Sequence, residues 1–356
     1  MAHLFTPLKI RSIELKNRIV VSPMCEYSSV DGFANDWHLV HLGSRAVGGA
    51  ALIITEATAV SPEGRISPDD LGFWKDEHIE KLQQIVTFIE EHGSIAGVQL
   101  AHAGRKASHV SPWKGGKALP ANDAAAWQTV APSALPFKDD EPVPLALDKA
   151  GIDKVINDFA VAAQRALKAG FKVIEIHAAH GYLLHEFYSP LSNKRNDEYG
   201  GSFENRIRLT VEIAESIRKG WPAELPLLVR ISASDWTEGG WTIEDSVELA
   251  KVLKSKGVDL IDCSSGGNVP KAKIEVGPGY QVPFAEAVKK QAGILTGAVG
   301  MITTAQQAED ILSSGKADVI IIARELLRDP YFPLHAAKEL GADIKWPVQY
   351  ERAKPR

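Results

Sequence analysis

The segment IEIHAAHGYLLHEF (174–187) begins as an apolar run and ends in polar residues that include His177, His180 and Tyr182. Side chains three residues apart point to opposite faces of a straight strand. His177 and His180 can therefore converge only if the chain bends after His177, and Gly181 supplies backbone freedom for such a bend. The segment predicts a buried strand that runs out into a functional site.

Seven further runs of the same kind lie on either side of this one. Short, nearly continuous apolar runs separated by amphipathic segments are typical of parallel strands that are buried on both faces. The predicted strands are RIVVSPM (18–24), AALIITEA (50–57), IAGVQLAH (95–102), KVIEIHA (172–178), LLVRIS (227–232), DLIDCSS (259–265), ILTGAV (294–299) and DVIIIAR (318–324). Amphipathic patterns predict helices between them, for example over 152–170 and 203–220.

Eight strands that alternate with helices predict a (β/α)₈ TIM barrel, formed by residues 1–356 as a single domain. A doubly wound open sheet is the alternative, and it is disfavoured because no strand is followed by the glycine fingerprint of a dinucleotide fold. The segment 4–17 predicts an N-terminal β-hairpin that closes one end of the barrel. Long connections after the third and fourth strands, 103–150 and 183–204, predict capping loops at the other end, where such barrels carry their chemistry.

Composition and charge narrow the possible partners. The chain has 40 Lys and Arg against 45 Asp and Glu, a formal charge of −5, which argues against a nucleic-acid or anionic-membrane partner. No run of about 18 apolar residues is present, and MAHLFTPLKIRS lacks the apolar core of a signal peptide. Cys25 and Cys263 are too few for a disulfide framework. We therefore expect a cytoplasmic protein.

Glycines and arginines mark the ends of the later strands. TGAVGM (296–301) and IARELL (322–327) place Gly297, Gly300 and Arg324 after the seventh and eighth strands, where barrels commonly bind phosphate. These glycines could instead serve tight turns, with Arg324 paired to a surface carboxylate. Arg230 lies inside an apolar run, so it should pair either with Glu175 or with negative charge on a ligand.

The histidines also permit a metal site. His177, His180 and His185 could be ligands of a metal-dependent barrel hydrolase, which is the alternative function. Such a site needs further inward carboxylates or histidines, whereas the other strand ends supply mainly Gln, Ser and Gly. We therefore expect no metal.

Several motifs together resemble the old yellow enzyme family of FMN-dependent ene-reductases. They are SPMCEYS (22–28), QLAHAGRK (99–106), the stretch 174–206, DCSSGG (262–267), TGAVGMI (296–302), ARELLRDP (323–330) and VQYER (348–352). The resemblance covers about residues 4 to 352. It is strongest to a bacterial branch that includes xenobiotic reductases and that carries a cysteine, here Cys25, after Pro-Met. Two positions depart from the pattern: Ala323 stands where relatives often have glycine, and Glu26 where they tend to have a neutral residue.

The resemblance implies a tightly bound FMN, with NADPH or NADH as a transient reductant. Arg230 would carry positive charge near the N1–C2=O region of the flavin, and Gln99 would bind its pyrimidine edge. The implied cofactor-binding residues are Ser22, Pro23, Met24, Cys25, Ala57, Gln99, Arg230, Ser265 and Gly266, with Gly297, Gly300 and Arg324 at the phosphate.

The resemblance also implies the chemistry. His177 and His180 would donate hydrogen bonds to the carbonyl or nitro oxygen of an activated alkene, whose β-carbon accepts hydride from flavin N5. Tyr182 would give a proton to the α-carbon, although it could instead be an anchoring hydroxyl. Tyr27, Cys25 and Arg352 would contact the substrate. Arg352, in a C-terminal tail over 341–356, would reach the neighbouring subunit of a homodimer or homotetramer, unless it is only a solvated charge.

Overall fold

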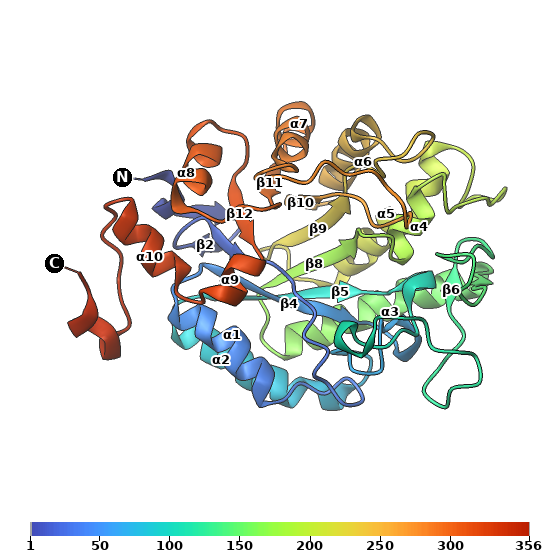
Figure 1. The fold of residues 1–356 in the computed structure, drawn as a ribbon, viewed down its shortest axis with the longest axis horizontal. Helices are drawn as coiled ribbons and strands as arrows, with labels where there is room; N and C mark the ends of the chain where they lie inside the picture. The colour runs from blue at the N-terminus through green and yellow to red at the C-terminus, as the bar shows by residue number, and fades with distance from the viewer. Residues whose placement is uncertain (1, 356) are drawn as a thin grey trace.

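The computed structural model of the protein describes residues 2–355 and contains a closed barrel of eight parallel strands (Figure 1). Around the barrel the strands keep their order along the chain, and β12 pairs with β3 to close it. Their bounds are β3 (Ile19–Val21), β4 (Leu52–Ala59), β5 (Ile95–Ala101), β8 (Val173–Ala178), β9 (Leu227–Ser232), β10 (Leu260–Ser264), β11 (Leu295–Ala298) and β12 (Val319–Ile322). The predicted TIM barrel is confirmed, and the open sheet is wrong because the sheet has no free edge.

The strand ends differ slightly from their predicted positions. The prediction of 18–24 for the first strand was too long, because the ladder stops at Val21 and the next residues turn into the barrel mouth. A proline at position 23 has no N–H to donate to a neighbouring strand. By contrast, β4 continues to Ala59, beyond the predicted end, with an irregularity between Ile54 and Ala57.

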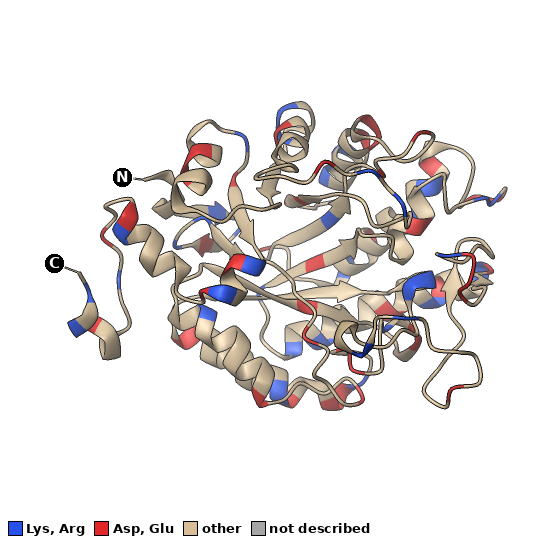
Figure 2. Cartoon of the chain, viewed as in Figure 1, with Lys and Arg blue, Asp and Glu red and all other residues tan. Residues whose placement is uncertain are grey.

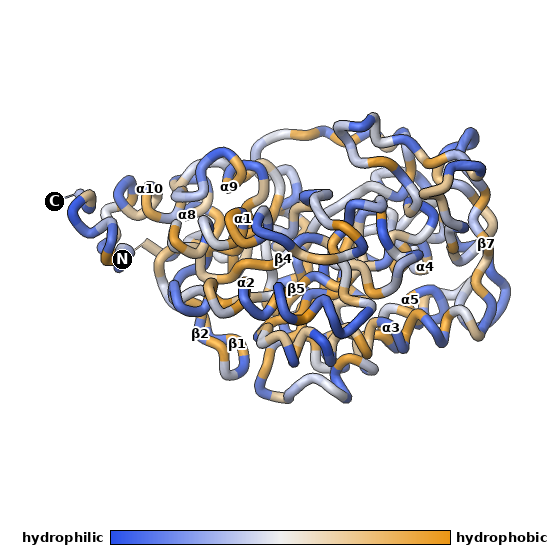
Figure 3. The backbone as a smooth tube through the Cα atoms, turned by 90° about the horizontal axis from the view of Figure 1, so that it is seen from below, coloured by the Kyte–Doolittle hydropathy of each residue, from blue (hydrophilic) through white to orange (hydrophobic). Residues whose placement is uncertain are grey.

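Helices form the outer layer of the barrel. The main ones are α1 (Asp36–Val47), α2 (Ile79–Glu91), α3 (Lys149–Lys168), α5 (Phe203–Gly220), α6 (Ile243–Ser255), α7 (Val282–Ala292), α8 (Ala305–Ser313) and α10 (Phe332–Glu339). Helix α5 matches its prediction, and its N-cap Ser202 accepts a hydrogen bond from the backbone of Asn205. Figure 3 shows hydrophobic and hydrophilic stretches alternating along the outer helices, as expected when one face packs on the barrel.

The barrel interior has an apolar layer at its closed end. Inward side chains from successive strands form it: Val20, Leu52, Ile54, Val173, Leu228, Leu260, Val319 and Ile321, all buried. The antiparallel hairpin of β1 (Leu8–Ile10) and β2 (Ile13–Leu15) packs Ile10 and Leu15 against this layer. The predicted N-terminal hairpin is therefore confirmed, and it covers the amino ends of the strands.

The two long connections leave the opposite end. Between β5 and α3 the chain forms two 3₁₀ turns and a short parallel pair, β6 (Val130–Ala131) with β7 (Leu145–Ala146). In the connection after β8, which was predicted as a loop, a short helix α4 (Leu183–Tyr188) forms instead. Tyr182 is extended at its N-cap, and the backbone N–H of Leu183 is bonded to the carbonyl of His102, which fixes where the helix begins.

The C-terminal segment lies at the closed end of the barrel. After α10 the chain ends in a 3₁₀ helix, η6 (Val348–Ala353). Residues 343–349 line a cavity of about 560 Å³ together with Lys16, Asn17 and Gly49, which precede the strands β3 and β4. In Figure 1 the C-terminus and the N-terminus lie on the same side of the molecule.

Charged residues of both signs are interspersed along the outer helices (Figure 2). Within residues 2–355, no helix combines the length and apolar character needed to cross a bilayer.

Candidate active site

The carboxyl ends of the strands bring most of the predicted site residues to one mouth. The barrel register sets His177 beside Arg230, Arg230 beside Asp262, and Gln99 beside Glu175. These pairings are parallel, so the side chains of neighbouring strands point into the barrel at similar heights.

The predicted bend after His177 is present. The rings of His177 and His180 lie 5.2 Å apart, centroid to centroid, and the ring of Tyr182 lies 5.0 Å from that of His177. His180 adopts a left-handed conformation at φ 60°, followed by Gly181 at φ 73°. A Cβ on Gly181 would stand 2.1 Å from the carbonyl oxygen of Gly267, so only glycine fits this approach of two loops.

Both imidazoles are neutral at pH 7. Burial lowers the pKa of His177 and of His180 well below the ordinary value, and the positive charge of Arg230 adds to the effect. The backbone N–H of Ala179 donates to Nδ1 of His177 at 3.2 Å. The proton of His177 is therefore carried on Nε2, which is a hydrogen-bond donor.

Ser264 orients the second histidine. Its hydroxyl lies 2.7 Å from Nε2 of His180 and 3.5 Å from Oε1 of Gln281. Gln281 in turn accepts from Ser265 at 2.6 Å and donates to the carbonyl of Val299. When Ser264 donates to Nε2, the proton of His180 lies on Nδ1, so this ring also can donate.

Two phenols and a thiol line the mouth beside the histidines. Burial raises the pKa of Tyr182, of Tyr27 and of the Cys25 thiol, so all three keep their protons at neutral pH. The neighbouring Cys25 adds to the raised pKa of Tyr27. The ring of Tyr27 meets that of Trp113, from the 103–150 connection, edge-on at 5.7 Å.

Arg230 pairs with a residue that the sequence did not single out. Its Nε lies 3.1 Å from Oδ2 of Asp262, and its Nη1 donates to Ser22 at 3.2 Å. Glu175, the predicted protein partner, accepts instead from Nε2 of Gln99 at 2.7 Å. Of the two partners predicted for Arg230, Glu175 is therefore wrong, because the neighbouring strand β10 places Asp262 directly opposite Arg230.

The buried layer of Gln99, Glu175, Arg230 and Asp262 holds two acids for one base. Burial and the nearby Asp262 together raise the pKa of Glu175 to about 8, against the opposing effect of Arg230. Burial likewise raises the pKa of Asp262 to about 6, although Arg230 opposes this. Glu175 thus holds a proton at pH 7.

This proton gives a pH-dependent contribution to stability. The pKa of Glu175 is about 8 in the folded protein against 4.5 ordinarily, so folding takes up a proton between these values and stability falls as pH rises through that interval. As pH rises from 5 to 8, the unfolding free energy of the wild type should fall. In Glu175→Gln this fall should be smaller by at least about 1 kcal/mol. Thermal melts of the holoprotein across this range measure it.

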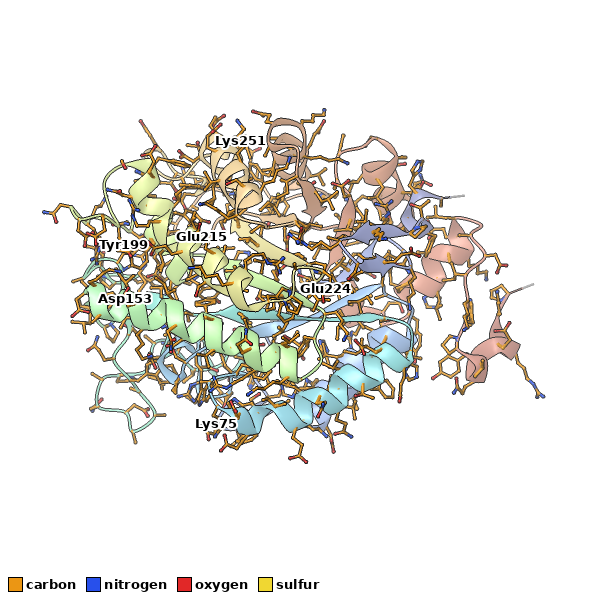
Figure 4. The ribbon with its side chains drawn as sticks, turned by 180° about the vertical axis from the view of Figure 1, so that it is seen from behind. Lys75, Asp153, Tyr199, Glu215, Glu224 and Lys251 are labelled. Atoms are coloured by element: carbon orange, nitrogen blue, oxygen red, sulfur yellow. The ribbon has the colours of Figure 1, made fainter. Side chains whose placement is uncertain are left out.

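Glu224→Gln is the matched control, since Glu224 is an exposed glutamate near the closed end (Figure 4). This variant should follow the wild-type profile. Identical pH profiles for Glu175→Gln and the wild type would show that Glu175 is ionised in the folded state.

The ends of the last strands present the predicted phosphate-binding groups. Gly300 is left-handed at φ 123°, and Arg324 begins the short helix α9 (Arg324–Arg328), with Ala323 as its N-cap. Arg324 is exposed and forms no ion pair with any residue of 2–355. At Gly297 a Cβ would stand 2.3 Å from Cδ1 of Ile321, so packing inside the barrel also requires this glycine.

These residues fit an FMN. Arg230 is buried and its Nε has no hydrogen-bond partner in the described chain, despite the ion pair. It offers a donor and a positive charge to the polar edge of a flavin ring, as such cofactors require. Arg324 and Gly300 follow the neighbouring strands β12 and β11, and a guanidinium without an ion pair among residues 2–355 suits a phosphate there. The other predicted cofactor residues border the same mouth. They are Ser22, Pro23 and Met24 after β3, Ala57 within β4, and Ser265 and Gly266 after β10.

Arg352 does not join the other predicted site residues. It lies exposed in η6, in the tail that packs at the closed end of the barrel. In its own chain it is therefore at the end opposite the mouth.

Two residues of the site were not predicted from the sequence. Asp262 lies in β10, and Lys106 follows β5 in a 3₁₀ turn. A polar residue inside an apolar strand was the available signal for Asp262, as it was for Arg230. Glu26, which had no explanation, accepts a hydrogen bond from Nε1 of Trp37 at 2.9 Å and so ties the mouth loop to α1.

The alternative metal site gains no support. Within the described part of the chain, no group of three or more His, Cys, Asp or Glu side chains is arranged to hold a metal ion. Nε2 of His180 bonds to Ser264, and Nε2 of the buried His185 lies 2.8 Å from Oδ1 of Asp235.

Curated relatives match the chain over almost its whole length. It is 52% identical over 351 residues to an NADPH dehydrogenase of Geobacillus thermodenitrificans, covering 98% of both chains. It is 54% identical over 353 residues to an NADPH dehydrogenase of Bacillus cytotoxicus, covering 98% of this chain and 96% of that protein.

Solved structures share the fold. Morphinone reductase has a TM-score of 0.79 at 28% identity, covering 97% of this chain and 91% of that one. An old yellow enzyme homologue from Zymomonas mobilis has a TM-score of 0.77 at 28% identity, covering 97% and 94%. 2-Naphthoyl-CoA reductase has a TM-score of 0.85 at 27% identity and covers 96% of this chain, which spans only 52% of that longer protein.

The family model described as NADH:flavin oxidoreductase / NADH oxidase matches residues 3–343. This match and the relatives confirm the resemblance to the old yellow enzyme family and the expectation of FMN with NADH or NADPH. The chain belongs to the FMN-dependent NADH:flavin oxidoreductase / NADH oxidase family.

Proposed function

We propose that the protein is an ene-reductase that reduces activated C=C bonds of α,β-unsaturated carbonyl or nitro compounds. The observation that carries this proposal is the neutral pair His177 and His180 beside Tyr182 at the mouth. Two neutral donors and a protonated phenol are the groups that such a reduction needs. FMN, when bound and reduced by NADPH or NADH, supplies hydride for the β-carbon.

The histidine pair serves as an oxyanion site in this proposal. Nε2–H of His177 and Nδ1–H of His180 donate to the carbonyl or nitro oxygen of the substrate. Negative charge grows on that oxygen as the β-carbon is reduced, so donors held in place stabilise the transition state more than the substrate. The backbone N–H of Ala179 sets the tautomer of His177, and Ser264 holds the ring of His180 through Nε2, which leaves its proton on Nδ1 when the Ser264 hydroxyl donates to that nitrogen.

Tyr182 is the proton donor in this proposal. Burial raises its pKa, so it arrives protonated, and the product requires one proton at the α-carbon. We expect Tyr182→Phe to lower alkene turnover about 10²-fold, within the usual range for a general acid, with a smaller change in KM. NADPH consumption with cyclohexenone measures it.

The matched control is Tyr199→Phe. Tyr199 lies beside Asp153 in Figure 4 and bonds Lys149 and Glu212 at the outside of the barrel. It should retain wild-type turnover. If Tyr182→Phe turned over at the wild-type rate, Tyr182 would only anchor its loop through its hydroxyl, and the proton would have to come from water.

We infer that the predicted cofactor residues hold the FMN in two groups. The flavin ring is bordered by the first group, which is Ser22, Pro23, Met24, Cys25, Ala57, Gln99 and Arg230. The ribityl chain and phosphate are bordered by the second group, which is Ser265, Gly266, Gly297, Gly300 and Arg324. We further infer that residues 103–150 cap the mouth, since Trp113 of this segment contacts Tyr27. Cys25 and Tyr27 then line the substrate side.

We also propose that the chain forms a homodimer or homotetramer in which Arg352 reaches the mouth of a neighbour. The support is its position: exposed, in a tail that carries exposed Val348 and Tyr350, and distant from its own mouth. If light scattering shows an oligomer, Arg352→Ala should raise KM for the alkene several-fold. This corresponds to a loss of about 1 kcal/mol of binding free energy, as for a charge at the rim of an interface. Lys354→Ala in the same tail is the control, and an unchanged KM in an oligomer would place Arg352 on the surface.

A further inference from the structure

Lys106 lies where three segments of the mouth meet, and none of the roles described above uses it. It belongs to the 3₁₀ turn Gly104–Lys106 that follows β5. Its Nζ donates to the carbonyl oxygen of His180 at 2.8 Å and to that of Gly267 at 3.0 Å. One ammonium group therefore joins the loop after β8 to the loop after β10.

The two carbonyls belong to residues with unusual backbone conformations. His180 is left-handed at φ 60°, and Gly267 at φ 91°. A left-handed residue other than glycine costs of order 1 kcal/mol or more, and it persists only where its surroundings hold it. A Cβ on Gly267 would stand 2.6 Å from the carbonyl oxygen of His180, so the two loops touch at this point. Lys106 supplies hydrogen-bond donors to the carbonyl oxygens of His180 and Gly267 at this contact.

The same ammonium faces two aromatic rings. It lies 4.6 Å from the ring centroid of Phe137, in the 103–150 segment, and 5.2 Å from that of Tyr182. Both distances are within the range of a cation–π contact. Lys106 thus links the capping segment, the backbone of His180 and the ring of Tyr182.

The charge of Lys106 is set by its surroundings. Burial lowers its pKa to about 8, which Glu186 and Glu141 oppose and which Arg105 and Lys138 reinforce. Glu186 itself is buried, and burial raises its pKa to about 8. His177 and His180 face Lys106 from the loop after β8, and their pKa values are lowered by burial and, in part, by its positive charge.

We propose that Lys106 is a positioning residue for alkene reduction, which holds the His180 turn in place and stabilises the phenolate left on Tyr182. This inference rests on the proposed function. In the proton-transfer step the O–H bond of Tyr182 breaks, a C–H bond forms at the α-carbon, and the O–H electron pair stays on the phenolate. Water later returns the proton. A cation near the ring favours that transient anion without bonding to the substrate.

The test compares Lys106→Met and Lys106→Arg with the wild type and with Lys138→Met. Lys138 is the matched control, because it also lies near the Phe137 ring, at 5.7 Å, but is exposed and paired with Glu141. Rapid mixing measures separately flavin reduction by NADPH and flavin reoxidation by cyclohexenone, in H₂O and in D₂O. Calorimetry measures the affinity for 4-hydroxybenzaldehyde, a carbonyl compound that cannot be reduced at a β-carbon.

We expect Lys106→Met to keep its FMN and its rate of reduction by NADPH, while reoxidation slows about 10–10²-fold, in the range of lost transition-state stabilisation. Its solvent isotope effect should increase, and its affinity for the aldehyde should fall. Lys106→Arg should recover most of the rate, and Lys138→Met should behave as wild type. Reoxidation at the wild-type rate with an unchanged isotope effect would overturn the proposal, as would equal loss in the Met and Arg variants.

A second measurement remains decisive if Lys106→Met does not fold. Wild-type reoxidation should slow as pH rises through about 8, where Lys106 loses its charge, whereas Lys106→Arg should not show this step. Glu175 and Glu186 titrate in the same range, but they are present in both proteins. The same step in both proteins would overturn the proposal. Failure of the wild type to be reoxidised by any activated alkene would instead refute the proposed function.

Discussion

Replacing His177 or His180 by alanine should lower the rate of alkene reduction about 10²–10³-fold, the usual cost of one oxyanion donor. Each imidazole is neutral and held by a neighbour, Ala179 for the first and Ser264 for the second, so each presents one N–H. That donor is strongest for the negative charge that develops on the substrate oxygen, so kcat should fall more than KM rises. Rapid mixing of the reduced protein with cyclohexenone measures the effect.

FMN content and flavin reduction by NADPH are internal controls, because the loss should fall mainly on reoxidation. His335→Ala is the matched variant, since His335 is an exposed histidine on α10 that is paired with Asp329. It should keep the wild-type rate. If both His177→Ala and His180→Ala reduced cyclohexenone as fast as the wild type, the oxyanion role would be wrong.

Arg230→Met should destabilise the protein by about 3–5 kcal/mol, the cost of leaving a buried charge without its partner. Arg230 is the one cation of the buried layer, and without it the carboxylate of Asp262 has no counter-charge. The pKa values of both acids should rise further. Chemical denaturation of the apoprotein at pH 7 separates this effect from any loss of FMN binding.

Asp262→Asn in the Arg230→Met background should recover a large part of this stability, because the uncompensated charge is removed. The control is Arg328→Met, whose exposed ion pair with Glu325 should contribute less than about 1 kcal/mol. A loss in Arg230→Met no larger than in Arg328→Met would show that water or a neutral Asp262 already relieves the charge. No recovery in the double variant would assign the loss to packing.

The fold could be predicted because its signal is local. Each strand is a short apolar run bounded by polar residues, and this pattern can be recognised without knowing how the strands pair. The helix α5 was predicted with the bounds that the structure has, since its cap and its apolar face lie within the segment itself. The short helix α4 was not predicted, because its start depends on a contact between Leu183 and the backbone of His102 in another loop.

The site could be predicted only in part. The bend at His180 and Gly181 follows from the spacing of the histidines and a glycine within one segment. The partner of Arg230 does not, because Glu175 and Asp262 lie on the two strands that flank it and only the barrel register decides between them. Lys106 could not be identified for a similar reason: its partners, His180 and Gly267, are far from it along the chain.

In the proposed function, a flavin at this mouth passes electrons from NADPH to an activated alkene. The most direct test is the absorbance of the purified protein, kept anaerobic, before and after NADPH and then after cyclohexenone. We expect absorbance bands at about 450 nm that bleach with NADPH and return with cyclohexenone, as flavin hydride transfer requires. Bands that bleach and do not return with any activated alkene would contradict the proposed function.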